Sequence, residues 1–205
     1  MNRLRPLLFA LLALALAACA ATPGIPDTTY YRLPPRESTA ALPAPLFDVP
    51  IVVDTLVADG LHSDQALIYA LDPSAIRLRA YHYQLWVDPP VRMLQRRLTG
   101  SLRQARAAPL VADRLPAQVD RVRIGGRLEA FERIPREDGG WDVLVAMVLR
   151  VDAPGSEVPL LVRAYRQRLP ADSDTVHASV LAIGQALDRL LADFHADLAA
   201  AVADD

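Results

Sequence analysis

Histidine, serine and aspartate side chains are the first candidates for bond-making chemistry in this chain. No two of the four histidines have the spacing, with an adjacent acid, that places a metal-binding pair on one helix face in zinc proteases. Gly100-Ser101 and Gly155-Ser156 lack the second glycine of the strained turn that exposes a nucleophilic serine. Asp54, Asp59 and Asp64 lack the glycine and the terminal glutamate of a calcium loop. We therefore predict no catalytic residue, no metal site and no cofactor, which disfavours a hydrolase.

The sole cysteine, Cys19, follows a segment with the pattern of an export signal. Arg3 and Arg5 precede an apolar run from Leu7 to Ala18 that ends in small residues. This run is shorter than the roughly 20 residues that a helix needs to cross a bilayer. A single cysteine also excludes an intrachain disulfide and a zinc site built from several thiolates. Residues 1–18 are therefore predicted to be a signal peptide.

The four residues Leu16-Ala17-Ala18-Cys19 resemble the bacterial lipobox. The resemblance implies that Cys19 becomes the first residue of the mature protein and carries diacylglycerol on its sulfur and an acyl chain such as palmitate on its amine. Stable anchoring takes at least two chains, so three hold a protein on a membrane permanently. Residue 20 is Ala, whereas an Asp at this position would resemble an inner-membrane retention signal. We therefore expect the lipoprotein to be anchored in the outer membrane, with its domain facing the periplasm. The alternative is an ordinary signal peptide that contains a cysteine.

Composition predicts one globular domain without a general attraction to nucleic acid. The 205 residues are 52% hydrophobic and 22% charged, which is the balance of a folded protein. All 22 basic residues are arginine, and the formal charge is −2. Removal of residues 1–18 leaves 20 arginines against 24 acids, a charge of −4. Such a domain has no excess positive charge for nucleic acid or for anionic headgroups, so the lipid itself must do the anchoring.

The elements that follow Cys19 begin with a tether. Residues 19–29 are small, polar and rich in proline, and the domain is predicted to span residues 30–205. Tyr30 to Leu33 predicts a short strand, and Leu46 to Val57 predicts a buried one. Gln65 to Leu71 and Ala75 to Trp86 alternate around the turn Asp72-Pro73-Ser74, which predicts a hairpin.

A long amphipathic helix is predicted after this hairpin. Asp88 is its expected N-cap, Pro89-Pro90 its first turn and Pro109 its end. The helical spacing of five apolar residues predicts a buried stripe: Val91, Leu94, Leu98, Leu102 and Ala105. Five arginines cover the remaining surface, and we interpret them as a solvated face in preference to a phosphate-binding stripe: Arg92, Arg96, Arg97, Arg103 and Arg106.

The second half predicts a meander of three strands and a closing helix. Val119 to Ile134, Trp141 to Val151 and Val158 to Leu169 are separated by glycine-containing turns. The continuous apolar run Val143 to Leu149 predicts a strand covered on both faces, and Gly125-Gly126 predicts a bulge. Residues 172–174 are expected to cap the last helix, whose apolar stripe we assign to core packing in preference to a coiled-coil seam. The predicted class is α/β: a single domain with a mixed β-sheet packed by two long amphipathic helices.

Together with the lipobox, three segments resemble the ABC-type transport auxiliary lipoproteins, including the paraquat-inducible protein C type. They are the strand Tyr30-Tyr31-Arg32-Leu33, the segment from Ile68-Tyr69 to Trp86, and the helix start Trp86-Val87-Asp88-Pro89-Pro90. The resemblance implies a fold similar to anticodon-binding-like and TolB N-terminal domains, and it implies no catalytic residues. It also implies that the protein acts together with mammalian-cell-entry (MCE) domain proteins and their ABC transporters, which move lipids between the inner and outer membranes.

Three aromatic residues are candidates for partner binding. Trp86 either packs in the core or lines a partner groove, since its amphipathic ring suits both positions. Tyr30 and Tyr31 lie closest to the tether, and at least one of them is expected on the inward face of an edge strand. The alternative function is an envelope scaffold or assembly lipoprotein for an outer-membrane β-barrel complex. A homo-oligomer is compatible with both functions.

Overall fold

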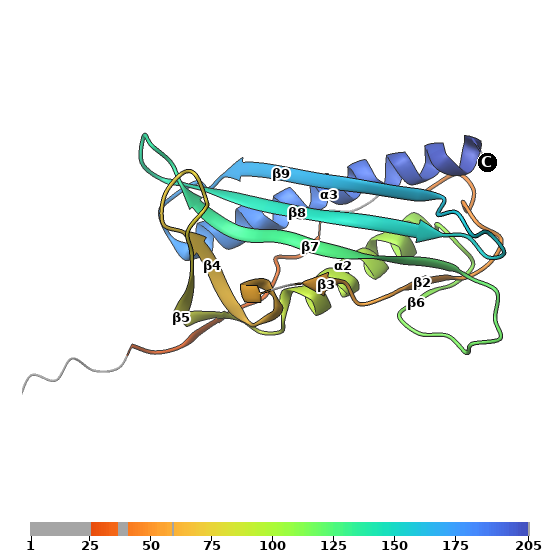
Figure 1. The fold of residues 1–205 in the computed structure, drawn as a ribbon, viewed down its shortest axis with the longest axis horizontal. Helices are drawn as coiled ribbons and strands as arrows, with labels where there is room; N and C mark the ends of the chain where they lie inside the picture. Colours follow the sequence, from red (N-terminus) through yellow and green to blue (C-terminus); the bar gives the residue numbers. More distant parts are fainter. Residues whose placement is uncertain (1–25, 37–40, 59, 205) are drawn as a thin grey trace, which may run out of the picture.

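A long antiparallel meander forms the middle of the protein (Figure 1). The structure is a computed structural model that describes residues 26–36, 41–58 and 60–204. Strands β7 (Val122–Pro135), β8 (Trp141–Asp152) and β9 (Leu161–Pro170) pair side by side in antiparallel order. The β7–β8 turn passes through Gly139 and Gly140, whose φ angles of 89° and 78° suit residues without a Cβ. The predicted meander is confirmed.

Six further strands extend the sheet beyond β7: β1 (Thr29–Tyr31), β2 (Ile51–Val53), β3 (Val57–Ala58), β4 (Ala66–Ala70), β5 (Leu78–Trp86) and β6 (Val111–Ala112). The path of paired strands is β1-β5-β4-β7-β2-β6, with β3 also paired to β7. Strands β2, β3 and β4 run parallel to β7, whereas β4 and β5 form the predicted antiparallel hairpin. The sheet is therefore mixed, as expected. The 3-10 turn η1 (Gly60–Ser63) lies between β3 and β4.

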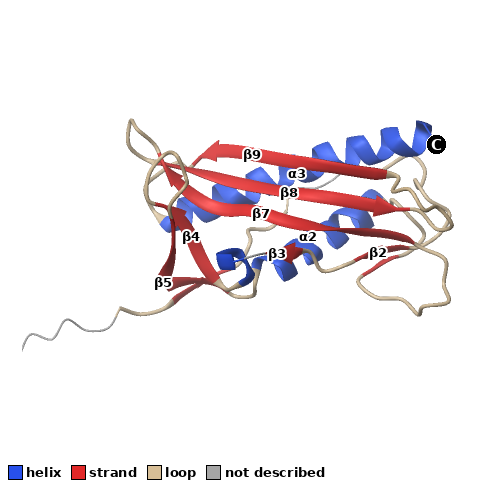
Figure 2. Ribbon diagram, viewed as in Figure 1, coloured by secondary structure: helices blue, strands red, loops and turns tan. Residues whose placement is uncertain are grey.

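Two helices lie on one side of this sheet, behind it in Figure 2. They are α2 (Pro90–Ala105) and α3 (Val176–Asp204). The predicted stripe of α3 is buried, because its apolar residues recur every three or four positions and face the strands. Its fully or nearly fully buried members are Val180, Ile183, Leu187, Leu190, Phe194 and Leu198. Over the described residues, neither helix has the length and apolar character needed to span a bilayer.

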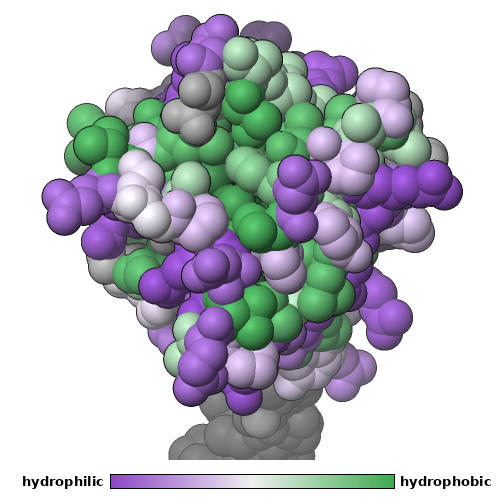
Figure 3. Space-filling view, turned by 90° about the vertical axis from the view of Figure 1, so that its right-hand side faces the viewer, coloured by the Kyte–Doolittle hydropathy of each residue, from purple (hydrophilic) through white to green (hydrophobic). Residues whose placement is uncertain are grey.

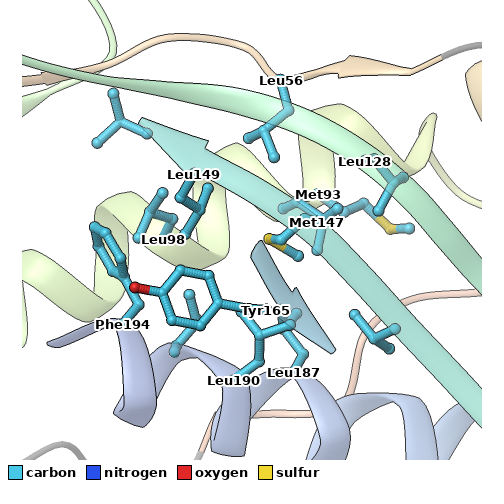
Figure 4. Packing of buried hydrophobic residues seen from close by; sticks show 14 of the residues in the cluster. Leu56, Met93, Leu98, Leu128, Met147, Leu149, Tyr165, Leu187, Leu190 and Phe194 are labelled. Carbon is cyan, nitrogen blue, oxygen red and sulfur yellow. The ribbon is translucent and has the colours of Figure 1, made fainter. Parts of the chain in front are cut away.

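The main core fills the space between β8, β9 and the two helices (Figure 4). Tyr165 of β9 meets Phe194 of α3 edge to face, with ring centroids 5.9 Å apart. On the other face of β8, Leu144 and Ala146 pack in a smaller cluster with Ile134 of β7 and Ala70 of β4. The predicted strand covered on both faces is thus confirmed for β8.

The ends of α2 differ from the prediction. Pro89 occupies the N-cap position without a side-chain hydrogen bond, and the Asp88 carboxylate instead pairs with Arg96. The helix ends at Ala105, four residues before the expected Pro109. Arg106 adopts a left-handed φ of 56°, and backbone N–H groups at the end donate to the carbonyls of Arg103 and Leu102. This left-handed cap terminates the helix without help from proline.

Two further local predictions are wrong. The side-chain cap of α3 is Thr175, whose Oγ1 accepts the Ala178 N–H at 3.1 Å, and not one of residues 172–174. The irregularity of β7 lies between Leu128 and Ala130, and not at Gly125-Gly126. Gly126 has a different reason to be glycine: a Cβ there would lie 2.1 Å from the carbonyl oxygen of Val148 on β8.

Candidate functional site

The described chain joins the sheet at β1, the end nearest the predicted tether. Tyr31 faces inward against the core, and its hydroxyl donates to Gln84 Oε1 of β5 at 2.8 Å. Tyr30 points outward and is 60% exposed. β1 is an edge strand, and Tyr31 lies on its inward face. The expectation that at least one of these two tyrosines faces inward on an edge strand is therefore confirmed. Cys19 lies outside the described residues, so its lipidation stays a prediction.

Trp86 belongs to the core. Its side chain is 1% exposed, and its ring packs against Phe131 of β7 with centroids 5.3 Å apart. The two rings join the end of β5 to the middle of the sheet. Of the two alternatives for Trp86, the structure therefore supports core packing over a partner groove, because a partner cannot contact a ring that the fold encloses.

A buried arginine that the sequence analysis did not single out lies at the tether end of the sheet. Arg133 of β7 is 2% exposed. Its Nη1 donates to the Tyr81 hydroxyl at 2.6 Å and its Nη2 to the Asp174 carbonyl at 2.8 Å. Its guanidinium lies 4.1 Å from the Trp141 ring centroid, a cation–π contact. Its Nε is buried with no hydrogen-bond partner, and no carboxylate of the described residues forms an ion pair with it.

Strand register builds a polar aromatic cluster around this arginine. Tyr69 of β4 lies opposite Arg79 of β5 on one side and opposite Arg133 of β7 on the other. The Tyr69 ring stacks on Tyr81 with centroids 4.4 Å apart and meets Trp141 edge-on at 6.4 Å. Burial lowers the pKa of Arg133, an effect that Tyr81 partly opposes, and burial raises the pKa of Tyr81. Arg133 remains a cation and Tyr81 remains a protonated phenol at neutral pH.

An open cleft of about 490 Å³ lies beside this cluster. Its walls are Tyr69 and one stretch of β5, closed by Val176 at the start of α3 and by Pro26 next to the tether. The β5 residues are Arg79, Ala80, Tyr81, His82, Tyr83 and Gln84. No acidic side chain of the described residues lines this cleft, although the chain as a whole is acidic.

Ser101 and His195 form a hydrogen bond of 2.7 Å between α2 and α3. The residue types match a nucleophile and its base, but Ser101 is only 1% exposed. Burial and the nearby Arg36 lower the pKa of His195 to about 4, so its ring is neutral at neutral pH. A serine enclosed between two helices cannot reach a substrate carbonyl, and the pair is best understood as a contact between the helices.

A second buried histidine pairs with an acid. His62 of η1 and Glu132 of β7 lie 2.9 Å apart, and both are less than a tenth exposed. Among the described residues, no three histidine, cysteine or acidic side chains group closely enough to hold a metal ion. We therefore interpret the His62–Glu132 contact as a structural link between η1 and β7 of the sheet, and not as part of a metal site.

The end of the protein opposite β1 exposes apolar side chains. There the β8–β9 connection, the β6–β7 loop and the last turns of α3 come together (Figure 1), and apolar surface occupies the middle of this end in Figure 3. A shallow hollow of about 390 Å³ is lined by Val158, Pro159, Leu160 and Ala201. Val158 is 72% exposed and Val162 54%. We call this surface, with Leu110 and Val119, the distal patch.

A family model identifies the family of the chain, and solved structures share its fold. The family model described as "ABC-type transport auxiliary lipoprotein component" matches residues 31–194. A solved protein from Xanthomonas campestris, of the family DUF330, is similar with a TM-score of 0.73 at 16% identity, over 86% of this chain and 98% of its own. A hypothetical protein from Chlamydia trachomatis is similar with a TM-score of 0.54 at 9% identity, over 78% of this chain and 100% of its own. No curated protein matches.

Proposed function

Because the chain belongs to the ABC-type transport auxiliary lipoprotein components, we propose that it is a non-enzymatic lipoprotein of an MCE-type lipid transport system. It is held on the periplasmic face of the outer membrane by acyl chains at Cys19. Its role is positional: the anchor fixes the domain at the membrane, and a protein surface receives the end of the MCE-domain partner. The single observation that supports this most strongly is the family match over residues 31–194.

The geometry of the two ends fits this role. Tyr30 and the first described residues leave the fold at the end where β1 and β5 lie, and the distal patch is at the other end (Figure 1). A protein tethered by its N-terminus holds the first end at the bilayer and directs the second toward the periplasm. Contiguous exposed apolar patches are typical of surfaces that bind another protein or a membrane. We assign the distal patch to the MCE-domain partner.

Lipid transfer through the partner requires no reaction in this chain. The serine–histidine pair is enclosed, and the described residues form no metal site. A conduit inside the partner keeps the lipid acyl chains out of water. This is favourable because exposing the apolar surface of those chains to water costs free energy in proportion to its area. The auxiliary lipoprotein then contributes alignment of that conduit with the outer membrane.

Site-specific photo-crosslinking in native cells tests this function. A photoreactive amino acid replaces Val158, in the distal patch, or Ile76, which is 84% exposed in the β4–β5 turn at the opposite end. We expect Val158 to form a product with an MCE-domain protein, identified by mass spectrometry, and Ile76 to form none. Exclusive crosslinks from both positions to an outer-membrane β-barrel would reject this function and favour the scaffold alternative.

A further inference from the structure

The buried charge of Arg133 forms no ion pair with a carboxylate among the described residues. A guanidinium removed from water is stable only when its charge is paired and its N–H groups are hydrogen-bonded. Arg133 has a phenol, a backbone carbonyl and an aromatic face as partners, and its Nε has none. The Asp174 carboxyl acts on it only through space. Within the described residues, the positive charge of Arg133 is therefore balanced only in part.

Tyr81 connects the Arg133 guanidinium to the cleft. Its oxygen accepts the Arg133 N–H at 2.6 Å, and the same residue forms part of the cleft wall. A phenol that accepts a hydrogen bond from a cation retains its own O–H for donation. Arg79 lines the same cleft and is exposed, with no ion pair to a described residue. The start of α3, at Val176, adds the positive end of a helix dipole.

The ligand chemistry that suits this arrangement is a phosphate ester. A phosphate offers several acceptor oxygens for the Tyr81 O–H and the Arg79 guanidinium. The rings of Tyr69 and Tyr83 offer apolar surface to the carbon skeleton beside the phosphate. Aromatic side chains with polar tips are also the ones that favour the headgroup level of a membrane.

Position favours a lipid headgroup as the source of this phosphate. Pro26 lines the cleft and follows Cys19 by seven residues, which span at most about 25 Å when extended. The cleft is thus within reach of the headgroups around the protein's own anchor. We propose that the cleft beside Arg133 binds the phosphate of a phospholipid headgroup at the anchoring membrane, an inference that depends on the proposed lipid anchor.

Titration of the mature lipoprotein in dodecyl maltoside tests the site. The probe is dihexanoyl phosphatidylglycerol, and the readout is the NMR signal of the Trp141 indole N–H, with the core residue Trp86 as internal reference. We expect a saturable shift of Trp141 alone. Parallel titrations use inorganic phosphate and dihexanoyl glycerol. Equal affinity for inorganic phosphate would identify a free-phosphate site, and an equal response to the phosphate-free lipid would also overturn the proposal.

Two variants locate the binding without removing the buried arginine that supports α3. Tyr81→Phe keeps the ring and removes the donor, and Arg79→Gln removes the exposed charge. Each is expected to weaken phosphatidylglycerol binding about tenfold, as loss of one charge-assisted hydrogen bond predicts. The matched control is Arg123→Gln, an exposed strand arginine paired with Asp54 away from the cleft. Unchanged binding in both test variants would contradict the proposed site.

Failure of this proposal is distinguishable from failure of the proposed function. The titration uses the isolated lipoprotein, whereas the crosslinking at Val158 depends only on the partner. Phosphatidylglycerol binding without an MCE-domain crosslink would retain the cleft and reject the transport role. An MCE-domain crosslink without phosphatidylglycerol binding would retain the transport role and reject the cleft as a headgroup site.

Discussion

Arg97 of α2 binds Asp188 of α3 at two points, with both Nη2 to carboxylate oxygen distances equal to 2.7 Å. Its Nη1 also donates to the Pro34 carbonyl at 2.6 Å, in the segment that follows β1. The side chain of Arg97 is only 8% exposed, although the sequence predicts it as one of five solvated arginines. This ion pair joins the two helices and the N-terminal segment.

Replacing Asp188 with Asn is expected to lower the free energy of unfolding by about 3–5 kcal/mol, because it leaves a buried guanidinium without its counterion. Urea unfolding of the mature lipoprotein in detergent, followed by circular dichroism, measures this change. The matched control is Asp88→Asn, which breaks the exposed Arg96–Asp88 pair. It is expected to cost about 1 kcal/mol or less. Similar losses in both variants would show that burial of the Arg97 pair has no special effect.

Gly126→Ala is expected to destabilise the β7–β8 pairing. The new Cβ would lie 2.1 Å from the Val148 carbonyl oxygen, so the backbone has to shift. Overpacking of this kind costs about 1–3 kcal/mol. Gly125→Ala is the matched control, because the nearest atoms to its Cβ belong to Asp54 at 3.8 Å or more. Thermal unfolding midpoints compare the two, and an equal effect would contradict the close approach at Gly126.

His195 makes stability depend on pH in the acid range. Its folded pKa is about 4, whereas an exposed histidine titrates near 6.5. Between these values the unfolded state binds the proton and the folded state does not, so stability falls as pH falls through that window. From pH 7 to pH 5 this contribution amounts to about 2 kcal/mol. Urea unfolding at both pH values measures it, and His195→Gln should lose that much less stability than the native chain. Equal losses would mean that His195 titrates normally.

Trp86 and Tyr30, two of the three aromatic residues predicted as candidates for partner binding, have different expected roles. Trp86→Ala removes a buried ring and is expected to cost about 3–5 kcal/mol of stability. Tyr30→Ala changes an exposed side chain, so its effect on stability is expected to be within about 0.5 kcal/mol. Chemical denaturation of both variants measures these changes. A stable Trp86→Ala protein would mean that the Trp86 ring is not required for the core.

Local patterns predicted the parts of the fold that depend on neighbours in sequence. The apolar stripe of α3 and the turn at Gly139-Gly140 follow from helical spacing and from backbone conformation. The helix caps were harder to predict, because Asp88 and residues 172–174 are all good cap types. Only the backbone path shows that Thr175 is the residue that accepts the Ala178 N–H.

The cleft site could not be predicted, because register between distant strands creates it. Arg79, Tyr69 and Arg133 come from three strands that adjoin only after β4 pairs with β7 in parallel. Sequence did contain one signal: Glu132-Arg133 places two adjacent charges directly between the apolar residues Phe131 and Ile134. In the structure both are buried, one against His62 and the other against Tyr81.

Cys19→Ser tests the proposed covalent anchor, on which the proposed orientation of the whole protein depends. The oxygen of serine does not accept the diacylglycerol that the lipobox resemblance implies for the cysteine sulfur, so the acyl chains are absent. Because the acyl chains are the proposed anchor, we expect the processed variant to leave the membrane fraction on cell fractionation and immunoblotting. Ala20→Asp is the companion variant: it keeps the acyl chains and resembles an inner-membrane retention signal, so the protein should move to the inner-membrane fraction. Retention of processed Cys19→Ser protein on the outer membrane would show that something other than the lipid holds the domain there.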